Sequence, residues 1–519
     1  FAWLVEDEPE LAYELAADLV AMHAPTADPW VEELAATTAL ATGRWAEVPE
    51  LAPVRAVEPW LEWLGAVRYA ESLERSGLDD AAIDAWIALE QRLDRAVRQV
   101  GVAAEQERFL AGRSISAQRL VDLLLRGGHD DAAMCRARLA IARAVQAADR
   151  NARVAALTPA QRAGWDAEIE RYQALRSANE QATQGEWVLP AEELARVRMR
   201  RAEQLADADA RIDALLGISP AAADCARLAE PSATHPLVVA FAGVDDVVVF
   251  VADDARVHTL RVPLDATPAR YAQALVEPLG ALADAERVTV LASGVATAIP
   301  FHALVHEGAT LLPDTPIAYG LDLLSRPAAI DDDEPSAALI VADPRGDLGA
   351  AAEEAAIVEQ RLRDASWRIV VRRGDEATRE ALLAGLAEAS LFHYAGHGSR
   401  GVAAWDAALR LAGDTELRVG DVLAIPKVPA HVVLAGCHTG RRDDASLAGG
   451  MSLGRAFVLA GADAALVADT EVEDSATRAL TEALYRDPSL ALPTALRRAQ
   501  TQLRAGGIAD WSSFRVLVR

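Results

Sequence analysis

The sequence predicts an α+β multidomain protein in which an N-terminal α-helical repeat region precedes an α/β region. Two observations support this prediction. Residues 1 to about 217 are rich in Ala, Leu, Glu and Arg, and their apolar positions recur every three or four residues. From residue 235 onward, short β-branched runs alternate with helical stretches, a pattern typical of a largely parallel sheet covered on both faces.

Short turns that contain glycine divide the helical region into hairpins. The interval from Gly43 to Gly77 equals one period of a tetratricopeptide (TPR) helical hairpin, which is about 34 residues. Gly128 follows Gly77 after a longer interval, so the array is irregular. We therefore expect TPR-like helical repeats over residues 1–150, and an array of this kind usually presents a concave surface to another protein.

A long helical hairpin and a linker are expected over residues 151–234, with the hairpin turning near Gly185. Eight of the eleven tryptophans fall in the helical region, where large aromatic side chains at helical spacing favour hairpin core over a ligand cage.

The α/β region is expected to contain two units, residues 235–330 and 331–519, because an acidic, Pro-containing break occupies residues 331–335. Short apolar runs in both units predict strands. The predicted strands are Leu237–Phe241, Val247–Val251, Val288–Leu291, Ala338–Val341, Trp367–Val371, Ser390–Tyr394 and Val432–Ala435.

Charge and cysteine content exclude several classes of function. The chain has 51 Lys and Arg against 78 Asp and Glu, a net charge of -27 that repels nucleic acid and anionic lipid, and the sequence contains no basic patch to override it. Three widely spaced cysteines exclude a disulfide scaffold and a Cys-rich zinc site.

Cofactor, metal and membrane signals are missing from the sequence as well. The ten histidines show no zinc-type spacing and no Gly-Lys-Ser/Thr phosphate loop occurs, so we expect no cofactor and no metal. The apolar runs are shorter than the roughly 18 residues of a membrane helix. No basic-then-apolar leader occurs, and we expect a cytoplasmic protein with no membrane partner and no direct nucleic-acid partner.

Two predicted strands end in reactive side chains beside glycine. One runs into Gly396-His397-Gly398 and another into Gly436-Cys437. Functional groups gather beyond the carboxyl ends of parallel strands, and glycine lets a substrate approach while leaving amide N–H groups free for an oxyanion. A thiolate that attacks a carbonyl and a histidine that moves the proton are the minimum for thiol acyl transfer. Either residue alone is best interpreted as structural, but the pair with its glycines favours catalysis.

Further motifs occur in a definite order before and after the pair of His397 and Cys437. These motifs are Ile299–Leu304, Val341–Pro344, Ser452–Phe457, Ala460–Ala462, Ala495–Gln500 and Trp511–Phe514. As an ordered set over residues 235–519, and with the spacing of the pair itself, they resemble the CHAT domain, a caspase-like peptidase module of the clan that includes caspases, gingipains and separase. Helical repeats before such a module are the family's usual arrangement.

The resemblance implies a role for each matching residue. Cys437 would be the nucleophile and His397 the general acid/base, and the backbone N–H groups of Gly398 and Cys437 would form the oxyanion hole. Residues 235–330 would be a catalytically silent pseudo-caspase half, and residues 331–519 the active half of a caspase-like fold.

The chain departs from the family pattern at two places. Gly436 stands where the family has alanine, and residues 469–474 lack the Trp of the family's Leu-Trp-x-Val-x-Asp, in a loop that borders the specificity pocket of the clan. Acidic side chains nearby are candidates for binding an Arg or Lys side chain of the substrate. These candidates are Asp343, Asp469, Glu471 and Asp474.

Other interpretations of these acidic residues stay open. A preference for a small apolar residue is the main competitor, because acidic loops are common in so acidic a chain. Asp343 is also placed to cap the turn after its strand.

The first functional hypothesis is a cysteine endopeptidase that cleaves a specific partner protein, with the helical repeats recruiting the substrate or an activating protein. The loop Arg441–Ser446 is expected to be mobile until a partner binds or the loop is cut. The resemblance suggests a regulated bacterial pathway of antiviral defence or cell death. Two alternatives are a TPR-type protein-binding adaptor with a silent caspase-like domain, and a thiol acyltransferase or hydrolase of small molecules.

Overall fold

The computed structural model divides into two compact units. The first comprises Phe1–Gln99, Arg113–Ala133 and Ala163–Ala223, and the second Val100–Gly112, Met134–Arg162 and Asp224–Arg519. The structure describes residues 8–23, 29–51, 59–99, 109–110, 112–155, 157–183, 228–322, 336–399, 406–413, 415–440 and 450–519, with single positions between 193 and 215. The predicted turn near Gly185 and the predicted mobile loop Arg441–Ser446 lie outside the described residues.

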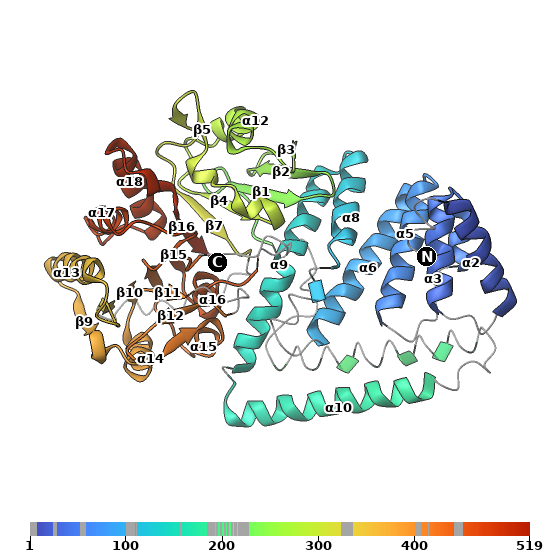
Figure 1. Cartoon of the computed structure of the whole chain (residues 1–519), viewed down its shortest axis with the longest axis horizontal. Helices are drawn as coiled ribbons and strands as arrows, with labels where there is room; N and C mark the ends of the chain where they lie inside the picture. Colours follow the sequence, from blue (N-terminus) through green and yellow to red (C-terminus); the bar gives the residue numbers. More distant parts are fainter. Residues whose placement is uncertain are drawn as a thin grey trace. The chain divides into compact units, whose positions relative to one another are not determined.

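The N-terminal half is helical, as predicted (Figure 1). Its elements are α2 (Pro9–His23), α3 (Pro29–Ala41), η1 (Trp45–Glu47), α4 (Val48–Leu51), α5 (Pro59–Arg75), α6 (Asp79–Gln99), α8 (Ile115–Arg126), α9 (Asp130–Ala155) and α10 (Pro159–Thr183). Successive helices pack on one another: α2 on α3, α3 on α5, α5 on α6, and α6 on α8. Trp86 is fully buried in this array, whereas about half of Trp30 is exposed.

Three left-handed glycines terminate helices of the array in the same way. Gly43, Gly77 and Gly128 have φ angles of 75°, 71° and 74°. In each turn the N–H of the following residue reaches back five residues, which is the Schellman motif. The three bonds run from Arg44 to Ala39 (2.8 Å), from Leu78 to Leu73 (3.0 Å) and from His129 to Leu124 (2.9 Å). The glycines that mark the turns in the sequence therefore end their helices because they adopt this conformation without strain.

The second unit is built on one mixed sheet of eleven strands in the order β3-β2-β1-β4-β7-β16-β15-β14-β10-β8-β9. Its strands are β1 (Leu237–Ala242), β2 (Asp246–Ala252), β3 (Val257–Pro263), β4 (Val288–Ala292), β7 (Ile317–Gly320), β8 (Ala337–Ala342), β9 (Arg368–Arg373), β10 (Leu391–Ala395), β14 (His431–Leu434), β15 (Ala464–Ala468) and β16 (Phe514–Val518). All seven predicted strands are confirmed, and β3, β7, β15 and β16 complete the sheet. A single sheet thus spans both predicted α/β units.

Helices cover both faces of this sheet (Figure 1). One face carries α12 (Pro268–Gly280), α14 (Arg379–Glu388), α15 (Val419–Leu423) and α16 (Leu453–Ala460), and the other α13 (Gly349–Asp364), α17 (Asp474–Leu484) and α18 (Leu492–Ala505). Alternate residues of a central strand enter the two cores, with Leu339 and Val341 on one side and Ala338 and Ile340 on the other. Burial on both faces explains why these strands are continuous apolar runs in the sequence.

Strand direction divides the sheet into two halves. The pairs β1/β2, β2/β3 and β15/β16 are antiparallel, and the other seven pairs are parallel. Because β16 opposes β15 but runs with β7, strands β8, β10, β14 and β15 run opposite to β1, β4 and β7. The carboxyl ends of β8, β10, β14 and β15 therefore share one edge of the sheet.

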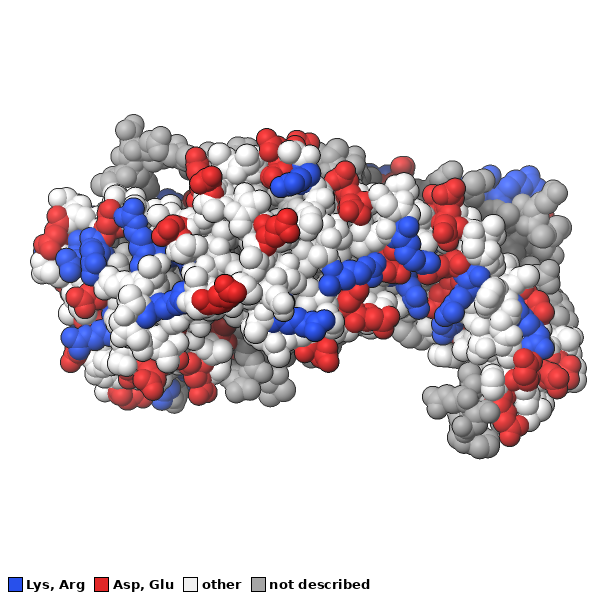
Figure 2. Space-filling view, turned by 90° about the horizontal axis from the view of Figure 1, so that it is seen from above, with Lys and Arg blue, Asp and Glu red and all other residues white. Residues whose placement is uncertain are grey.

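The part of the chain that the structure describes was compared with what a membrane span or a charged binding surface requires. None of its helices combines the length and the apolarity that crossing a membrane requires. On the face drawn in Figure 2, Lys and Arg side chains are interspersed with Asp and Glu.

A buried ion pair joins α9 to the α/β unit. Arg138 of α9 donates from Nε (2.9 Å) and Nη2 (2.7 Å) to the two carboxylate oxygens of Asp322, which follows β7. The side chains of the pair are only 5% and 7% exposed. Nη2 of Arg138 also donates to the Ala229 carbonyl at 3.0 Å. Residues of α9 from Met134 onward accordingly belong to the same compact unit as the sheet.

Replacing Arg138 with Met is expected to lower the free energy of unfolding by about 3–5 kcal/mol, because it leaves the Asp322 carboxylate buried without its countercharge. Adding Asp322→Leu to Arg138→Met should restore most of that loss, since no buried charge then remains. Urea denaturation measures both effects. Arg478→Met, which removes the exposed pair with Glu353, is the control and should cost no more than about 1 kcal/mol. Equal small effects at the two pairs would contradict the expectation.

Candidate active site

Two adjacent parallel strands bring the predicted cysteine and histidine to the same level of one sheet edge. β10 pairs with β14 in a register that places Tyr394 opposite Leu434. His397 follows Tyr394 by the same number of positions as Cys437 follows Leu434. Both residues therefore stand three positions beyond a directly paired couple of strand residues, in the loops at the shared carboxyl edge.

The two loops touch backbone to backbone. A Cβ added at Gly398 would overlap the carbonyl oxygen of Cys437. A Cβ added at Gly436 would lie 2.8 Å from the carbonyl oxygen of Gly396 and 3.1 Å from the amide nitrogen of Gly398. Glycine is thus required at both positions for this approach.

Cys437 and His397 differ in their surroundings. Cys437 is a free, half-buried thiol, and its Sγ lies 3.9 Å from the Val472 carbonyl oxygen. The His397 side chain is 44% exposed, and its Nε2 lies 3.2 Å from Oδ1 of Asp347. Cys135, by contrast, is disulfide-bonded.

Two backbone amides near Cys437 are available to a ligand. The short strand β11 (Gly398–Ser399) pairs with β12 (Ala408–Arg410), and Arg410 donates its N–H to the His397 carbonyl at 3.0 Å. Hydrogen-bonded and non-hydrogen-bonded pairs alternate along an antiparallel ladder, so the N–H of Gly398 points away from β12. Within the described residues, the N–H of Cys437 donates no hydrogen bond.

A buried tyrosine braces the histidine loop. The Tyr394 hydroxyl lies 2.8 Å from the His397 carbonyl oxygen and 2.6 Å from the Arg410 carbonyl oxygen. Burial raises the pKa of Tyr394, so its hydroxyl keeps the proton that it donates to these carbonyls. The sequence analysis missed this residue, although it stands three positions before His397 in the same motif.

Two of the four predicted substrate-binding acids have partners inside the protein. Oδ1 of Asp343 accepts the backbone N–H groups of Asp347 and Leu348, both at 3.1 Å. Asp469 forms an ion pair of 2.6 Å with Arg515 of β16, and these side chains are 17% and 5% exposed. Asp343 therefore caps the turn that follows β8, and Asp469 fixes the start of its loop.

The other two predicted acids are exposed. Glu471 is 81% exposed, and its Oε1 lies 3.2 Å from Nε2 of His438, the residue after Cys437. The N–H of His438 also donates to the Thr470 carbonyl at 3.4 Å. Asp474 is exposed in the first turn of α17. The acidic loop is thus packed against the cysteine loop.

Comparison with known proteins agrees with this arrangement. A protein-family model described as the CHAT domain matches residues 267–519. The C-terminal half of the chain carries a CHAT domain. The match begins at the residue before α12, so β1, β2 and β3 of the same sheet precede it. Both candidate loops lie within the residues that this family model matches.

Similar solved structures include two chains from Saccharomyces cerevisiae separase–securin complexes. The first, from a crystal structure at 3.0 Å resolution, is 17% identical with a TM-score of 0.35, over 45% of this chain and 16% of that chain. The second, at 2.6 Å resolution, is 10% identical with a TM-score of 0.42, over 98% of this chain and 61% of that chain. This chain therefore spans less than two thirds of either. No curated protein matches the sequence.

Other histidines of the CHAT domain face its core. His393 is buried, with Nδ1 3.1 Å from the Tyr485 hydroxyl and Nε2 3.3 Å from Oε1 of Glu354. His302 is buried between the Tyr319 hydroxyl (2.8 Å) and a backbone carbonyl (2.9 Å). Among the described residues, no three His, Cys, Asp or Glu side chains come together as metal ligands.

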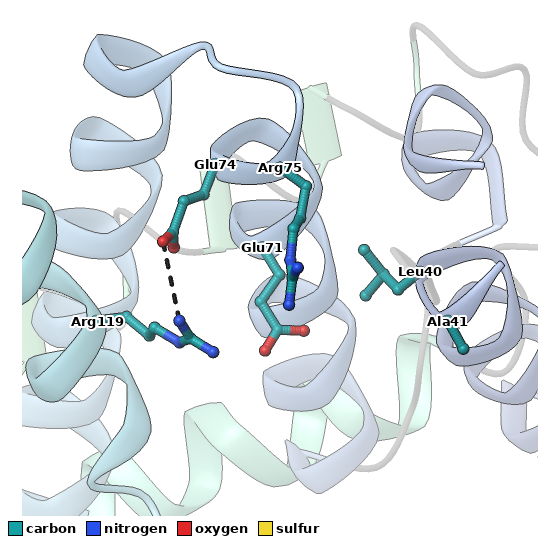
Figure 3. A pocket seen from close by; sticks show the side chains of 6 residues that line it. All are labelled: Leu40, Ala41, Glu71, Glu74, Arg75 and Arg119. Carbon is teal, nitrogen blue, oxygen red and sulfur yellow. Dashed lines mark ion pairs between the residues drawn. The ribbon is translucent and has the colours of Figure 1, made fainter. Parts of the chain in front are cut away.

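A pocket of about 150 Å³ lies in the helical unit (Figure 3). The side chains that line it come from α3, α5 and α8 and are Leu40, Ala41, Glu71, Glu74, Arg75 and Arg119. Glu74 pairs with Arg119 at 3.9 Å and with Arg126, and Glu71 pairs with Arg68 at 3.0 Å. Arginines of the same helical unit therefore offset the charge of both carboxylates in the pocket. None of the predicted site residues lines the pocket.

Replacing Gly398 with Ala is expected to lower the free energy of unfolding by about 1–3 kcal/mol, because the loops must separate to admit the new Cβ. Denaturation with urea provides the measurement. Gly349→Ala, at the start of α13 where an added Cβ meets nothing within 4 Å, is the matched control and should change stability by less than about 1 kcal/mol. Equal stability of the two variants would show that the loops are not in close backbone contact.

Proposed function

We propose that the CHAT domain is a cysteine endopeptidase in which Cys437 is the nucleophile and His397 the general acid/base. The observation that supports this proposal most strongly combines strand register and sequence. Tyr394 and Leu434 are directly paired in the sheet, and His397 and Cys437 each come three positions after one of them. The free thiol of Cys437 and the exposed imidazole of His397 agree with a site that meets a protein substrate at the surface.

The chemistry follows from these two groups. His397 takes the thiol proton, and the Cys437 thiolate attacks the scissile carbonyl carbon to form a tetrahedral oxyanion. The imidazolium then gives its proton to the amide nitrogen, the C–N bond breaks, and the amine product leaves. His397 next takes a proton from water, the resulting hydroxide attacks the thioester, and Cys437 departs as the thiol when it regains that proton.

The amides of Gly398 and Cys437 are the proposed oxyanion hole. The N–H of Gly398 points away from β12, and the N–H of Cys437 has no acceptor among the described residues. Preorganised donors of this kind stabilise the charge that develops on the carbonyl oxygen. Tyr394 supports the arrangement because its hydroxyl holds the carbonyl of His397, which immediately precedes Gly398.

Substrates with Arg or Lys before the cut are the proposed class. Glu471 is exposed in the loop that packs against Cys437, and Asp474 is exposed at the start of α17, which follows that loop; carboxylates at these places suit a cationic side chain. Asp343 and Asp469, whose internal partners already offset their charge, would contribute mainly by shaping the two loops.

The helical unit is proposed to bind a substrate or an activating protein. Support comes from its successive helix packing and from the pocket between α3, α5 and α8, since helical arrays of this type bind proteins on one surface. TPR-like repeats, a cytoplasmic location and a role in bacterial defence or cell death also remain proposals. The family resemblance suggests the defence role, and no described residue specifies it.

Cys437→Ala is expected to abolish cleavage of the protein substrate, lowering the rate about 1,000-fold or more, because no other group replaces the thiolate. His397→Ala should lower it by about 100-fold or more. Mass spectrometry of new peptide termini in lysate from the source cell, with and without each variant, measures both effects and reveals the residue before the cut. His306→Ala, a partly exposed histidine on β5 (Val305–His306), is the control and should cleave like the wild type.

A second readout covers the case in which an activator is missing from the lysate. If the wild type and Cys437→Ala give the same termini, and Cys437 reacts with iodoacetamide no faster than it does in His397→Ala, the endopeptidase proposal is wrong. The adaptor function would then be the better account of the chain.

Glu471→Gln is expected to lower kcat/KM for peptides with Arg or Lys before the cut by about three- to tenfold, because one carboxylate no longer attracts the cation. Peptides with a small apolar residue at that position should be unaffected. Glu307→Gln, an exposed carboxylate in the turn directly after β5, provides the matched control. Equal kcat/KM of the wild type and Glu471→Gln for the basic peptides would argue against this role of Glu471.

A further inference from the structure

We propose that Asp347 is a positioning residue for His397, an inference that rests on the proposed endopeptidase function. The carboxylate oxygen Oδ1 of Asp347 lies 3.2 Å from Nε2 of His397. Asp347 belongs to the loop after β8, the strand beside β10 in the sheet, so three adjacent strand ends contribute to one row of side chains. The carboxylate, the imidazole and the thiol stand in the loops that follow β8, β10 and β14 in turn.

The backbone around Asp347 is held so that its carboxylate stays near the imidazole. Oδ1 of Asp343 accepts the N–H groups of Asp347 and Leu348, both at 3.1 Å. Gly346 turns the chain with a φ of 70° and donates its N–H to the Asp343 carbonyl at 3.1 Å. Buried Pro344 packs so close to Gly396 that a Cβ there would lie 2.9 Å from its ring. The loop is therefore anchored on both sides of the carboxylate.

The contact selects one tautomer of His397. An ionised carboxylate can only accept a hydrogen bond, so the Nε2 that faces Asp347 carries the hydrogen and Nδ1 carries the lone pair. Within the described part of the chain, Nδ1 of His397 makes no hydrogen bond. Nδ1 is therefore the nitrogen that exchanges protons with the thiol and the leaving amine. The carboxylate also stabilises the imidazolium that forms after the thiol is deprotonated.

The same carboxylate has a competing role that the experiment must separate. Asp347 is 54% exposed and lies 4.0 Å from Nε of Arg345, so a cationic side chain of a substrate has access to it. A residue that only binds substrate leaves the reaction of Cys437 with a small neutral reagent unchanged. A residue that positions His397 alters that reaction in the absence of any substrate.

The test compares full-length wild type, Asp347→Asn and Asp364→Asn. Asp364 is the matched control. It is the last residue of α13 and accepts a hydrogen bond from Gln360 of the same helix. Because α13 connects two parallel strands, Asp364 lies at the edge of the sheet opposite the candidate site. Iodoacetamide labelling of Cys437, followed by mass spectrometry, gives the alkylation rate. We expect Asp347→Asn to label about two- to fivefold more slowly than the wild type, as befits an exposed charged pair, and Asp364→Asn to be unchanged.

A spectroscopic readout identifies the tautomer directly. With ¹⁵N-labelled histidine, and His397→Ala to assign the signals, the wild type should show a protonated Nε2 and an unprotonated Nδ1 at neutral to mildly alkaline pH. Asp347→Asn should show a mixture of the two tautomers, with thermal unfolding unchanged.

The possible results separate the two proposals. Wild-type labelling and an unchanged tautomer in Asp347→Asn would overturn the positioning role and leave the endopeptidase proposal intact. A raised KM for basic peptides with unchanged kcat and unchanged labelling would also overturn it, in favour of substrate binding. If the wild type gives the same termini as Cys437→Ala and also labels no faster than His397→Ala, the endopeptidase proposal itself fails, and the tautomer signature alone then decides whether Asp347 orients the imidazole.

Discussion

The candidate site depends on the direct backbone contact between the loops that follow β10 and β14. The parallel register brings the loops level, and the contact of Gly398 and Gly436 with the facing backbone lets them approach without intervening side chains. Every other feature of the site is built around that approach. Tyr394 holds the loop of His397 from beneath, and the acidic loop after β15 packs over the loop of Cys437. A bulkier residue at either glycine would therefore disturb all of these contacts together.

Buried ionic contacts tie this edge to the rest of the sheet. Arg515 pairs with Asp469 and also donates to the Thr297 carbonyl at 2.8 Å, so one guanidinium connects the loop beside the cysteine with a segment of the first half. Arg497, whose pKa burial lowers to about 10, donates to several backbone carbonyls of residues 302–313. Both arginines thus donate hydrogen bonds to backbone carbonyl groups of the half of the sheet without the cysteine. These bonds hold the two halves together.

Much of the fold could be predicted from the sequence, because burial on both faces leaves continuous apolar runs and left-handed turns leave glycines. Among the predicted features that the structure confirms are the helical region and all seven predicted strands. The close approach of the loops of His397 and Cys437 is another. Pairings between distant polar residues could not be predicted. Asp469 and Arg515 are far apart in the sequence with no pattern that links them, and Asp347 is one exposed acid in a chain with 78 Asp and Glu. Their partners are set by the order of strands in the sheet, which apolar patterning does not encode. The catalytic roles of Cys437 and His397 and the substrate-binding role of Glu471 are predictions.

The Schellman turns of the helical unit have a consequence for how such a chain changes in evolution. Each turn at Gly43, Gly77 and Gly128 closes its hydrogen bonds within a few residues of its own glycine. The described helices before α9 pack on their nearest neighbours in sequence. A hairpin that is gained or lost therefore carries its own turn with it, because that turn depends on no remote part of the array. The length of the helical unit can therefore change without any change in the turns that remain.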